Sequence, residues 1–91
     1  MTREEKDRVI ARLRRGWCQG VNALDAFGWR LGNGADPTAV QWCVTGACQS
    51  EQVPMPQSLG GATPVAFNDT IATSVDEVIA ALEAEPCDKN R

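Results

Sequence analysis

Histidine and tyrosine are both absent from this sequence of 91 residues, and three tryptophans and two phenylalanines are its only aromatic residues. Without histidine, a Cys-His catalytic pair within one chain is excluded. The sequence also contains no glycine-rich phosphate loop, no paired carboxylates for a metal and no Ser-centred nucleophile motif. No apolar run approaches the roughly 18 residues of a membrane-spanning helix. These absences favour a protein that is neither an enzyme nor embedded in a membrane.

Hydrophobic residues make up 43% of the chain, which suffices for the core of one small domain covering residues 1–91. Residues 1–8 are highly charged and lack the apolar segment of a secretory signal, so we expect a cytoplasmic protein. In that compartment the four cysteines are expected as thiols. We expect no cofactor, and we leave the oligomeric state open.

The net charge of −3 is unevenly distributed along the chain. Residues 1–30 carry seven basic and four acidic side chains, a net charge of +3, whereas residues 31–91 carry two basic and eight acidic ones, a net charge of −6. This polarity can steer a partner, or it can let the two halves of the chain attract each other. We favour the internal attraction, because nearly all the basic residues fall on one predicted helix.

Local signals predict a first helix over about residues 3–15. Thr2 and Glu5 match a capping box at its start, and arginines crowd its last turn, where they complement the helix dipole. Gly16 stands where a glycine cap would end the helix. Residues 17–31 then alternate imperfectly around the turn-forming segment 25–28 (Asp-Ala-Phe-Gly), which predicts a short β-hairpin.

A second helix is expected to begin at Asp36-Pro37, because Asp is a good N-cap and Pro suits the first helical position. This helix would carry Trp42 and turn Cys43 inward. Residues 51–64, rich in proline and glycine, are expected to form a loop.

The C-terminal part is expected to contain a short extended segment at residues 65–67 and then a turn at Asn68-Asp69. Ser74 and Glu77 match a second capping box, so a last helix should follow and end at Pro86, with residues 87–91 frayed. The sequence as a whole thus predicts an α+β domain in the order helix, β-hairpin, helix, loop, helix.

The cysteines raise the question of thiol or metal chemistry. Trp17-Cys18 and Trp42-Cys43 form two doublets, each with a glycine close behind, which is a typical packing arrangement in a small core. Cys18 is the candidate reactive thiol, because it follows a cluster of arginines that would favour a thiolate. A zinc site is disfavoured, since zinc modules bring their ligands in close pairs and only Cys43 and Cys48 are neighbours. A Cys18–Cys43 disulfide stays open on geometry, although the compartment disfavours it.

Two further groups are candidates for binding. Arg8, Arg12 and Arg15 line one side of the first predicted helix and form a possible surface for phosphates or a protein partner. The acidic net charge disfavours nucleic acid as that partner. Asn68 and Asp69 form either a binding corner or an Asx-type turn that orients the last helix, and we prefer the turn.

Several motifs together resemble those of a family of small bacterial and phage proteins classed as a domain of unknown function. The resemblance covers about residues 8–83. It rests on the Gly-Trp-Cys segment at 16–18, the Trp-Cys-x-x-Gly-Ala segment at 42–47 and the Phe-Asn-Asp segment at 67–69. This resemblance implies a fold and a link to mobile elements, and it supplies no activity or catalytic residues.

We therefore expect a small acidic, non-catalytic module that binds a host protein. The narrower form of this hypothesis is a phage- or mobile-element-derived inhibitor of a host bacterial defence protein. One alternative is a thiol-dependent enzyme or redox sensor that uses Cys18. Another is a binder of a small ligand or nucleic acid that uses the arginines of the first helix or the Asn68-Asp69 corner. No membrane partner is expected.

Overall fold

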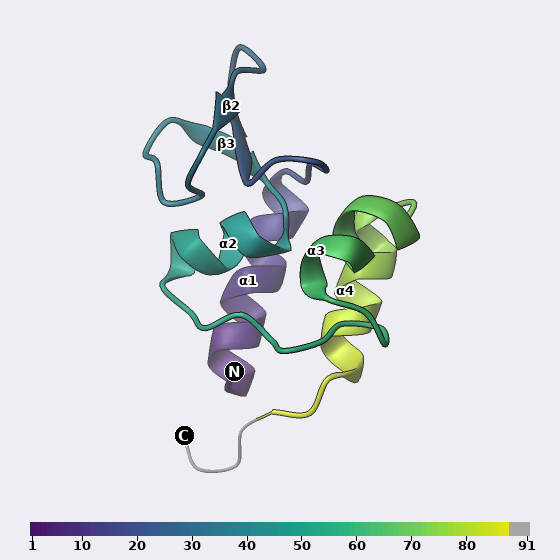
Figure 1. Cartoon of the computed structure of the whole chain (residues 1–91). Helices are drawn as coiled ribbons and strands as arrows, with labels where there is room; N and C mark the ends of the chain where they lie inside the picture. Colours follow the sequence, from purple (N-terminus) through teal and green to yellow (C-terminus); the bar gives the residue numbers. More distant parts are fainter. Residues whose placement is uncertain (88–91) are drawn as a thin grey trace.

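Helix α1 (Arg3–Arg15) is the element against which most of the fold packs. In the computed structural model, which describes residues 1–87, α1 contacts α2 (Val44–Glu51), α4 (Val75–Ala84) and strand β3 (Ala39–Trp42). Figure 1 shows α1 near the middle of the molecule, with the small sheet above it and the N-terminus below. The predicted α+β class and its single domain are confirmed.

The start of α1 forms as the sequence predicts, and its end forms differently. The Glu5 N–H donates to Thr2 Oγ1 (3.1 Å), and the Thr2 N–H donates to Glu5 Oε1 (2.8 Å). Gly16, in contrast, is extended (φ −178°) rather than left-handed. Glycine is needed there because a Cβ would lie 2.2 Å from the Val40 carbonyl oxygen. The missing side chain lets the chain that leaves α1 pass directly beside β3.

The predicted hairpin is present, and a third strand extends it into a sheet. Strand β1 (Ala23–Asp25) pairs antiparallel with β2 (Arg30–Leu31) on one side and with β3 on the other. The Trp42 N–H donates to the Gly16 carbonyl (3.0 Å), and the Cys18 N–H donates to the Trp42 carbonyl (3.1 Å). The segment after α1 therefore covers one end of the outer edge of β3.

The helix expected from Asp36 is wrong in its first half, because residues 36–39 form a turn that leads into β3. Asp36 Oδ1 accepts from the Thr38 N–H (2.9 Å), and the Ala39 N–H donates to the Asp36 carbonyl (3.1 Å). An Asp-Pro pair suits a type I turn as well as a helix start, and pairing with β1 selects the turn. Trp42 therefore ends a strand, and Cys43 is the N-cap of α2.

Residues 64–71 are helical, which corrects the expected extended segment and turn. The short helix α3 (Pro64–Ala66) continues into one π-helical turn, η1 (Phe67–Ile71), closed by a 2.8 Å hydrogen bond from the Ala72 N–H to the Phe67 carbonyl. Thr63 caps α3, because its Oγ1 accepts from the Ala66 N–H (3.2 Å). The predicted loop is correspondingly shorter, since its first residue belongs to α2 and its last to α3.

Helix α4 begins and ends as predicted, with one change in its capping. The Glu77 N–H donates to Ser74 Oγ (3.4 Å), but the Glu77 carboxylate accepts from the N–H (2.9 Å) and hydroxyl (2.8 Å) of Thr73. These two hydrogen bonds lower the pKa of the Glu77 carboxyl. Of the predicted frayed tail, residues 88–91 lie outside the described residues, and Cys87 is half-buried.

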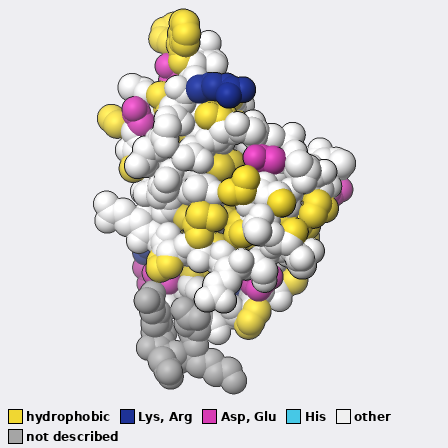
Figure 2. Space-filling view, viewed as in Figure 1, with side chains coloured by type: hydrophobic (Ala, Val, Ile, Leu, Met, Phe, Trp, Pro, Cys, Tyr) yellow, Lys and Arg dark blue, Asp and Glu magenta, His cyan; other side chains and the backbone are white. Residues whose placement is uncertain are grey.

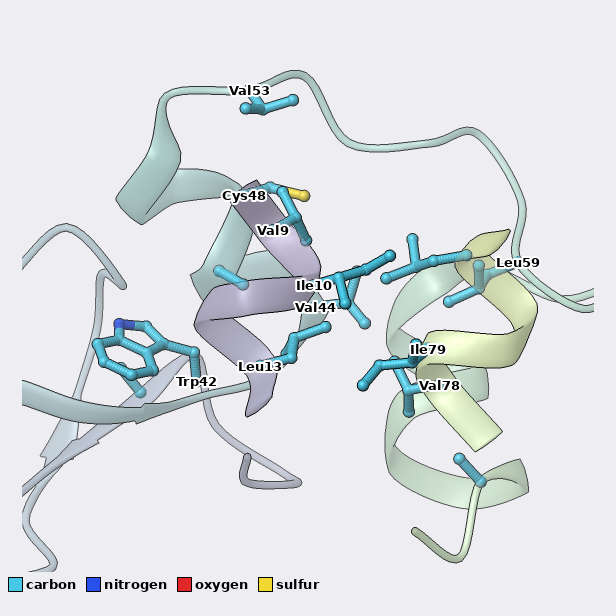
Figure 3. Packing of buried hydrophobic residues seen from close by; sticks show 14 residues of the cluster. Val9, Ile10, Leu13, Trp42, Val44, Cys48, Val53, Leu59, Val78 and Ile79 are labelled. Carbon is cyan, nitrogen blue, oxygen red and sulfur yellow. The ribbon is translucent and has the colours of Figure 1, made fainter. Parts of the chain in front are cut away.

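The hydrophobic core lies where α1 meets α4, α2 and β3. Figure 3 shows Val78 and Ile79 of α4 directed toward α1, with Trp42 on the opposite side of that helix. The expected central residues Trp42, Cys43 and Leu82 are buried, whereas Trp17 is only partly buried. Trp42 and Leu82 belong to the core cluster, whose other buried members are Val9, Ile10, Leu13, Ala23, Val44, Ala47, Cys48, Val53, Leu59, Ala72, Val78 and Ile79.

One charged side chain, Lys6, lies in the apolar stripe of α1. Lys6, Val9, Ile10 and Leu13 follow the spacing i, i+3, i+4, i+7 of a buried helix face, and Lys6 is only 1% exposed. Its ammonium donates to the Glu85 carbonyl oxygen at the C-terminal end of α4, where the helix dipole favours a cation. Lys6 is not among the candidate residues named from the sequence, although its place in the stripe is visible in the spacing.

Two glycines let the loop after β2 and the start of α2 pack without side chains between them. A Cβ on Gly34 would lie 1.9 Å from the Gly46 carbonyl oxygen, and a Cβ on Gly46 would lie 1.8 Å from the Asn22 carbonyl oxygen. The loop is also held by the Trp42 indole N–H, which donates to the Gly34 carbonyl (3.0 Å). The glycine behind the second Trp-Cys doublet is therefore a packing requirement.

Replacing Gly46 by alanine should lower the free energy of unfolding, although alanine is the better helix former by about 1 kcal/mol. The added Cβ meets the backbone of Asn22, which cannot rotate away, and overpacking of this kind costs roughly 1–3 kcal/mol. Gly32→Ala is the matched control, because a Cβ at Gly32 has no atom within 4 Å. Urea unfolding of both variants checks this, and a Gly46→Ala protein as stable as wild type would contradict it.

Candidate functional site

The Asn68 side chain is the point at which three segments of the chain meet: the segment after α1, the start of α2 and η1. Its Oδ1 accepts from the Trp17 indole N–H (2.8 Å) and from the Val44 N–H (3.2 Å) at the start of α2. Its amide nitrogen donates to the Cys18 carbonyl (3.1 Å) and to Asp69 Oδ1 (2.8 Å). Asn68 is 1% exposed, so this amide has no surface to offer a ligand.

The neighbours of Asn68 strengthen the same junction. The Gln19 side-chain amide donates to the carbonyls of Asn68 (2.9 Å) and Ala72 (3.0 Å), and the Gly20 N–H donates to Asp69 Oδ1 (3.0 Å). The residues from Trp17 to Gly20 are thus tied to η1. The predicted Asx turn is wrong, because Asn68 binds distant segments rather than its own backbone. The Asn68-Asp69 pair acts in the described structure as a tether.

The arginines of α1 are largely engaged within the protein. Glu51, at the end of α2, accepts from Arg12 Nε (2.9 Å) and Nη2, and it also lies 3.4 Å from Arg8 Nε. The Arg12 guanidinium lies over the Trp42 ring, 4.8 Å from its centroid, and that of Arg15 lies 5.8 Å from it. Arg8 and Arg12 of basic α1 are therefore paired with an acidic residue of the second half of the chain, in agreement with the uneven charge distribution.

The surroundings of Cys18 do not favour a thiolate. Burial raises the pKa of the Cys18 thiol to about 11, with smaller contributions from nearby Cys43 and Asp69. The Cys18 Sγ lies 3.7 Å from the Val21 carbonyl, to which it donates. Burial likewise raises the pKa of Cys48, to about 12. A buried neutral thiol is a weak nucleophile, so Cys18 has the character of a core residue.

Cys43 occupies the position that usually activates a thiol. As the N-cap of α2 it accepts from the Gly46 N–H (3.4 Å), and such helix N-termini stabilise a thiolate. Burial nevertheless prevails and raises the pKa of Cys43. All four cysteines lie in the described part of the chain and are free. Within residues 1–87 no three His, Cys, Asp or Glu side chains come together as a metal site.

The exposed aromatic residues are concentrated on the β1–β2 hairpin. Phe27 is 87% exposed and Trp29 is 71% exposed, although the chain has only five aromatic residues. Residues 26–29, the hairpin tip, project from the top of the molecule in Figure 1, and Figure 2 shows hydrophobic atoms at that end. From the sequence alone, these residues are assigned only to a turn. Aromatic residues on both sides of a turn glycine were the available signal.

Comparisons with known proteins give no match: no family model, no curated protein and no solved structure is similar to this chain. The resemblance to the bacterial and phage family therefore stays a prediction. Among residues 1–87, no helix has the length and apolar character that crossing a membrane requires.

Asn68→Ala should lower the free energy of unfolding by about 3 kcal/mol. The substitution leaves the Trp17 indole N–H, the Val44 N–H and the Cys18 carbonyl without this partner, and a buried unpaired polar group costs roughly 1–3 kcal/mol. Thr70→Ala is the control, because the exposed Thr70 hydroxyl donates only to the Ala66 carbonyl one turn earlier, and its effect should stay within about 0.5 kcal/mol. Denaturant unfolding measures both. Equal losses of stability in the two variants would contradict the role of Asn68 as a tether.

Alkylation of the native protein with iodoacetamide should modify Cys87 first. Cys87 is half-buried, whereas Cys18, Cys43 and Cys48 are buried with raised pKa values, so their modification should be at least tenfold slower. Peptide mapping by mass spectrometry gives the four rates. The same reaction in urea should modify all four at similar rates. Modification of Cys18 as fast as Cys87 in the native protein would instead support the thiol-dependent alternative.

Proposed function

We propose that this protein is a non-catalytic protein-binding module whose contact surface is the hairpin tip. The observation that carries the proposal is the exposure of Phe27 and Trp29 in a chain with few aromatic residues. Tryptophan is over-represented among the residues that contribute most to protein interfaces, where it fills pockets of the partner. These two large aromatic side chains are exposed to water and contribute nothing to the hydrophobic core.

The hairpin tip is held in one conformation, which favours binding. Asp25 Oδ1 accepts from the N–H groups of Phe27 (2.9 Å) and Trp29 (2.9 Å), and the Gly28 N–H donates to the Asp25 carbonyl (3.0 Å). Gly28 adopts a positive φ of 82°, which only glycine takes readily. A preformed tip loses less conformational entropy on binding than a flexible loop.

The indole N–H groups distinguish Trp29 from the other two tryptophans. The indoles of Trp17 and Trp42 donate to Asn68 and Gly34, so they are satisfied within the fold. For Trp29 the described residues supply no such acceptor. A partner that offers an apolar pocket with a hydrogen-bond acceptor at its rim matches this side chain.

The identity of the partner is the narrower part of the proposal. The resemblance to small bacterial and phage proteins supports an inhibitor of a host bacterial protein, carried by a phage or mobile element. A cytoplasmic location belongs to the same proposal and is supported by the four free thiols. The arginine surface is a weaker candidate for a partner or for nucleic acid, because Glu51 binds both Arg8 and Arg12.

Replacing both aromatic residues of the tip, in the double variant Phe27→Ser with Trp29→Ser, should abolish partner binding. Immobilised wild-type protein should retain specific proteins from a bacterial lysate, and the double variant should retain at least tenfold less of each, because aromatic anchors dominate interface energies. The control is Val65→Ser with Ile71→Ser, two exposed apolar residues of α3 and η1. Quantitative mass spectrometry compares the three captures.

Circular dichroism and thermal unfolding should show wild-type stability for the hairpin variant, since neither side chain contributes to the core. Capture of the same proteins, at the same level, by all three chains would contradict a binding role for the tip. If only the control variant, Val65→Ser with Ile71→Ser, lost capture, the partner-binding surface would be that of α3 and η1 instead.

A further inference from the structure

Arg30 stands directly beside the exposed aromatic residues of the hairpin tip. It follows Trp29 in the chain, begins β2 and is itself exposed. Figure 2 shows a basic side chain close to the hydrophobic atoms at the hairpin end of the molecule. Tryptophan and arginine are enriched among the residues that dominate protein interfaces, so their adjacency on a projecting hairpin points to one shared contact surface.

The guanidinium of Arg30 has no acidic partner within residues 1–87. Its cross-strand neighbour is Leu24, and Leu24 in turn lies opposite Gln41, so the directly opposed side chains of the sheet are neutral. Arg12 of α1, in contrast, is paired with Glu51. The N–H donors of the exposed Arg30 side chain are therefore available to another molecule.

The nearest acids along the chain serve the backbone of turns instead of pairing with Arg30. Asp25 Oδ1 accepts from the N–H groups of Phe27 and Trp29. Asp36 Oδ1 accepts from the N–H (2.9 Å) and the hydroxyl (2.6 Å) of Thr38, and these hydrogen bonds lower the pKa of the Asp36 carboxyl. The positive charge beside the tip is thus left without an ion pair in the described part of the chain.

We propose that the partner of the hairpin tip is an acidic protein segment, in which an aspartate or glutamate flanks an apolar pocket. Trp29 fills the pocket and Arg30 binds the carboxylate, whose two oxygens match the planar guanidinium in a pair of charge-assisted hydrogen bonds. The two strands of a hairpin lie about 5 Å apart, so one partner segment reaches both side chains. This inference rests on the proposed protein binding by the tip and adds the charge of the partner.

A single-stranded nucleic acid is the other anionic partner that an arginine and two aromatic residues suit. Binding of such a strand uses a basic groove that follows several phosphates. The described hairpin supplies one cation, Arg30, and the chain as a whole carries a net charge of −3, which repels a polyanion. One guanidinium beside an indole fits a single carboxylate next to an apolar pocket better than it fits a phosphate backbone.

Selection from a random library of short displayed peptides tests the charge of the partner without a known ligand. Peptides enriched on immobilised wild-type protein should contain Asp and Glu about twice as often as the unselected library, because a carboxylate gains a charge-assisted bond to Arg30. The double variant Phe27→Ser with Trp29→Ser should retain these peptides about tenfold less, because the aromatic anchors are then missing.

The most enriched peptide, made synthetically, measures the contribution of Arg30. Arg30→Gln should weaken its binding about tenfold, and so should a peptide with Gln in place of its acidic residues, because either change removes the charged pair. Arg14→Gln is the matched control: Arg14 is an exposed arginine of α1 outside the hairpin and should change affinity less than about twofold. Tryptophan fluorescence follows the titration, since Trp29 is exposed to the peptide.

The outcomes separate this inference from the proposed function. If retention requires Phe27 and Trp29 but the peptides show no excess of acidic residues, or if Arg30→Gln binds as wild type does, only the acidic partner is overturned. If the double variant retains the same peptides, or no peptide is enriched, protein binding by the tip fails as well. Tighter binding of oligothymidylate than of the peptide would assign the surface to nucleic acid. Should Arg30→Gln fail to fold, the peptide with Gln decides.

Discussion

The amide of Asn68 is the interaction on which the architecture depends. It joins η1 to the segment that leaves α1 and to the first turn of α2, so three helical elements are fixed relative to one another by one side chain. An asparagine is suited to this role because it both accepts and donates, and here both ends of the amide are used. The Trp-Cys doublet at residues 17–18 and the Phe-Asn-Asp segment, far apart in the sequence, turn out to be two halves of this junction.

The parts of the fold that depend on neighbouring residues were predictable. Thr2 and Glu5 define the start of α1, and Asp25 with Gly28 defines the hairpin turn, because each signal acts within four residues. Strand β3 was not predictable from Asp36-Pro37, since that pair suits a turn and a helix equally and distant β1 decides between them. The role of Asn68 was hidden for the same reason: three of its four partners lie 24 to 51 residues away.

The candidate sites likewise divide into those that can be predicted from neighbouring residues and those that depend on distant parts of the chain. The arginines of α1 are candidate binding residues because of their charge. Their contacts with Glu51 and Trp42 form only when the chain folds, so the sequence does not show them. The exposure of Phe27 and Trp29 likewise appears only when the hairpin is seen to project away from the core. Lys6 is the opposite case, because a lysine in line with Val9, Ile10 and Leu13 is visible from spacing alone. A charged residue within an apolar stripe is therefore a signal that sequence analysis can use.

The position of the Asn68 junction also bears on how the chain assembles. Closing a loop of about 50 residues costs conformational entropy before any contact forms, and the cost rises with the logarithm of the loop length. Before η1 packs against them, the segment after α1 and the first turn of α2 lack the hydrogen-bond partner that fixes their mutual orientation. Neither half of the chain therefore contains a complete folding unit. Small single domains usually unfold in one cooperative step, and cutting the chain between α2 and α3 would divide the junction rather than release two smaller folded parts.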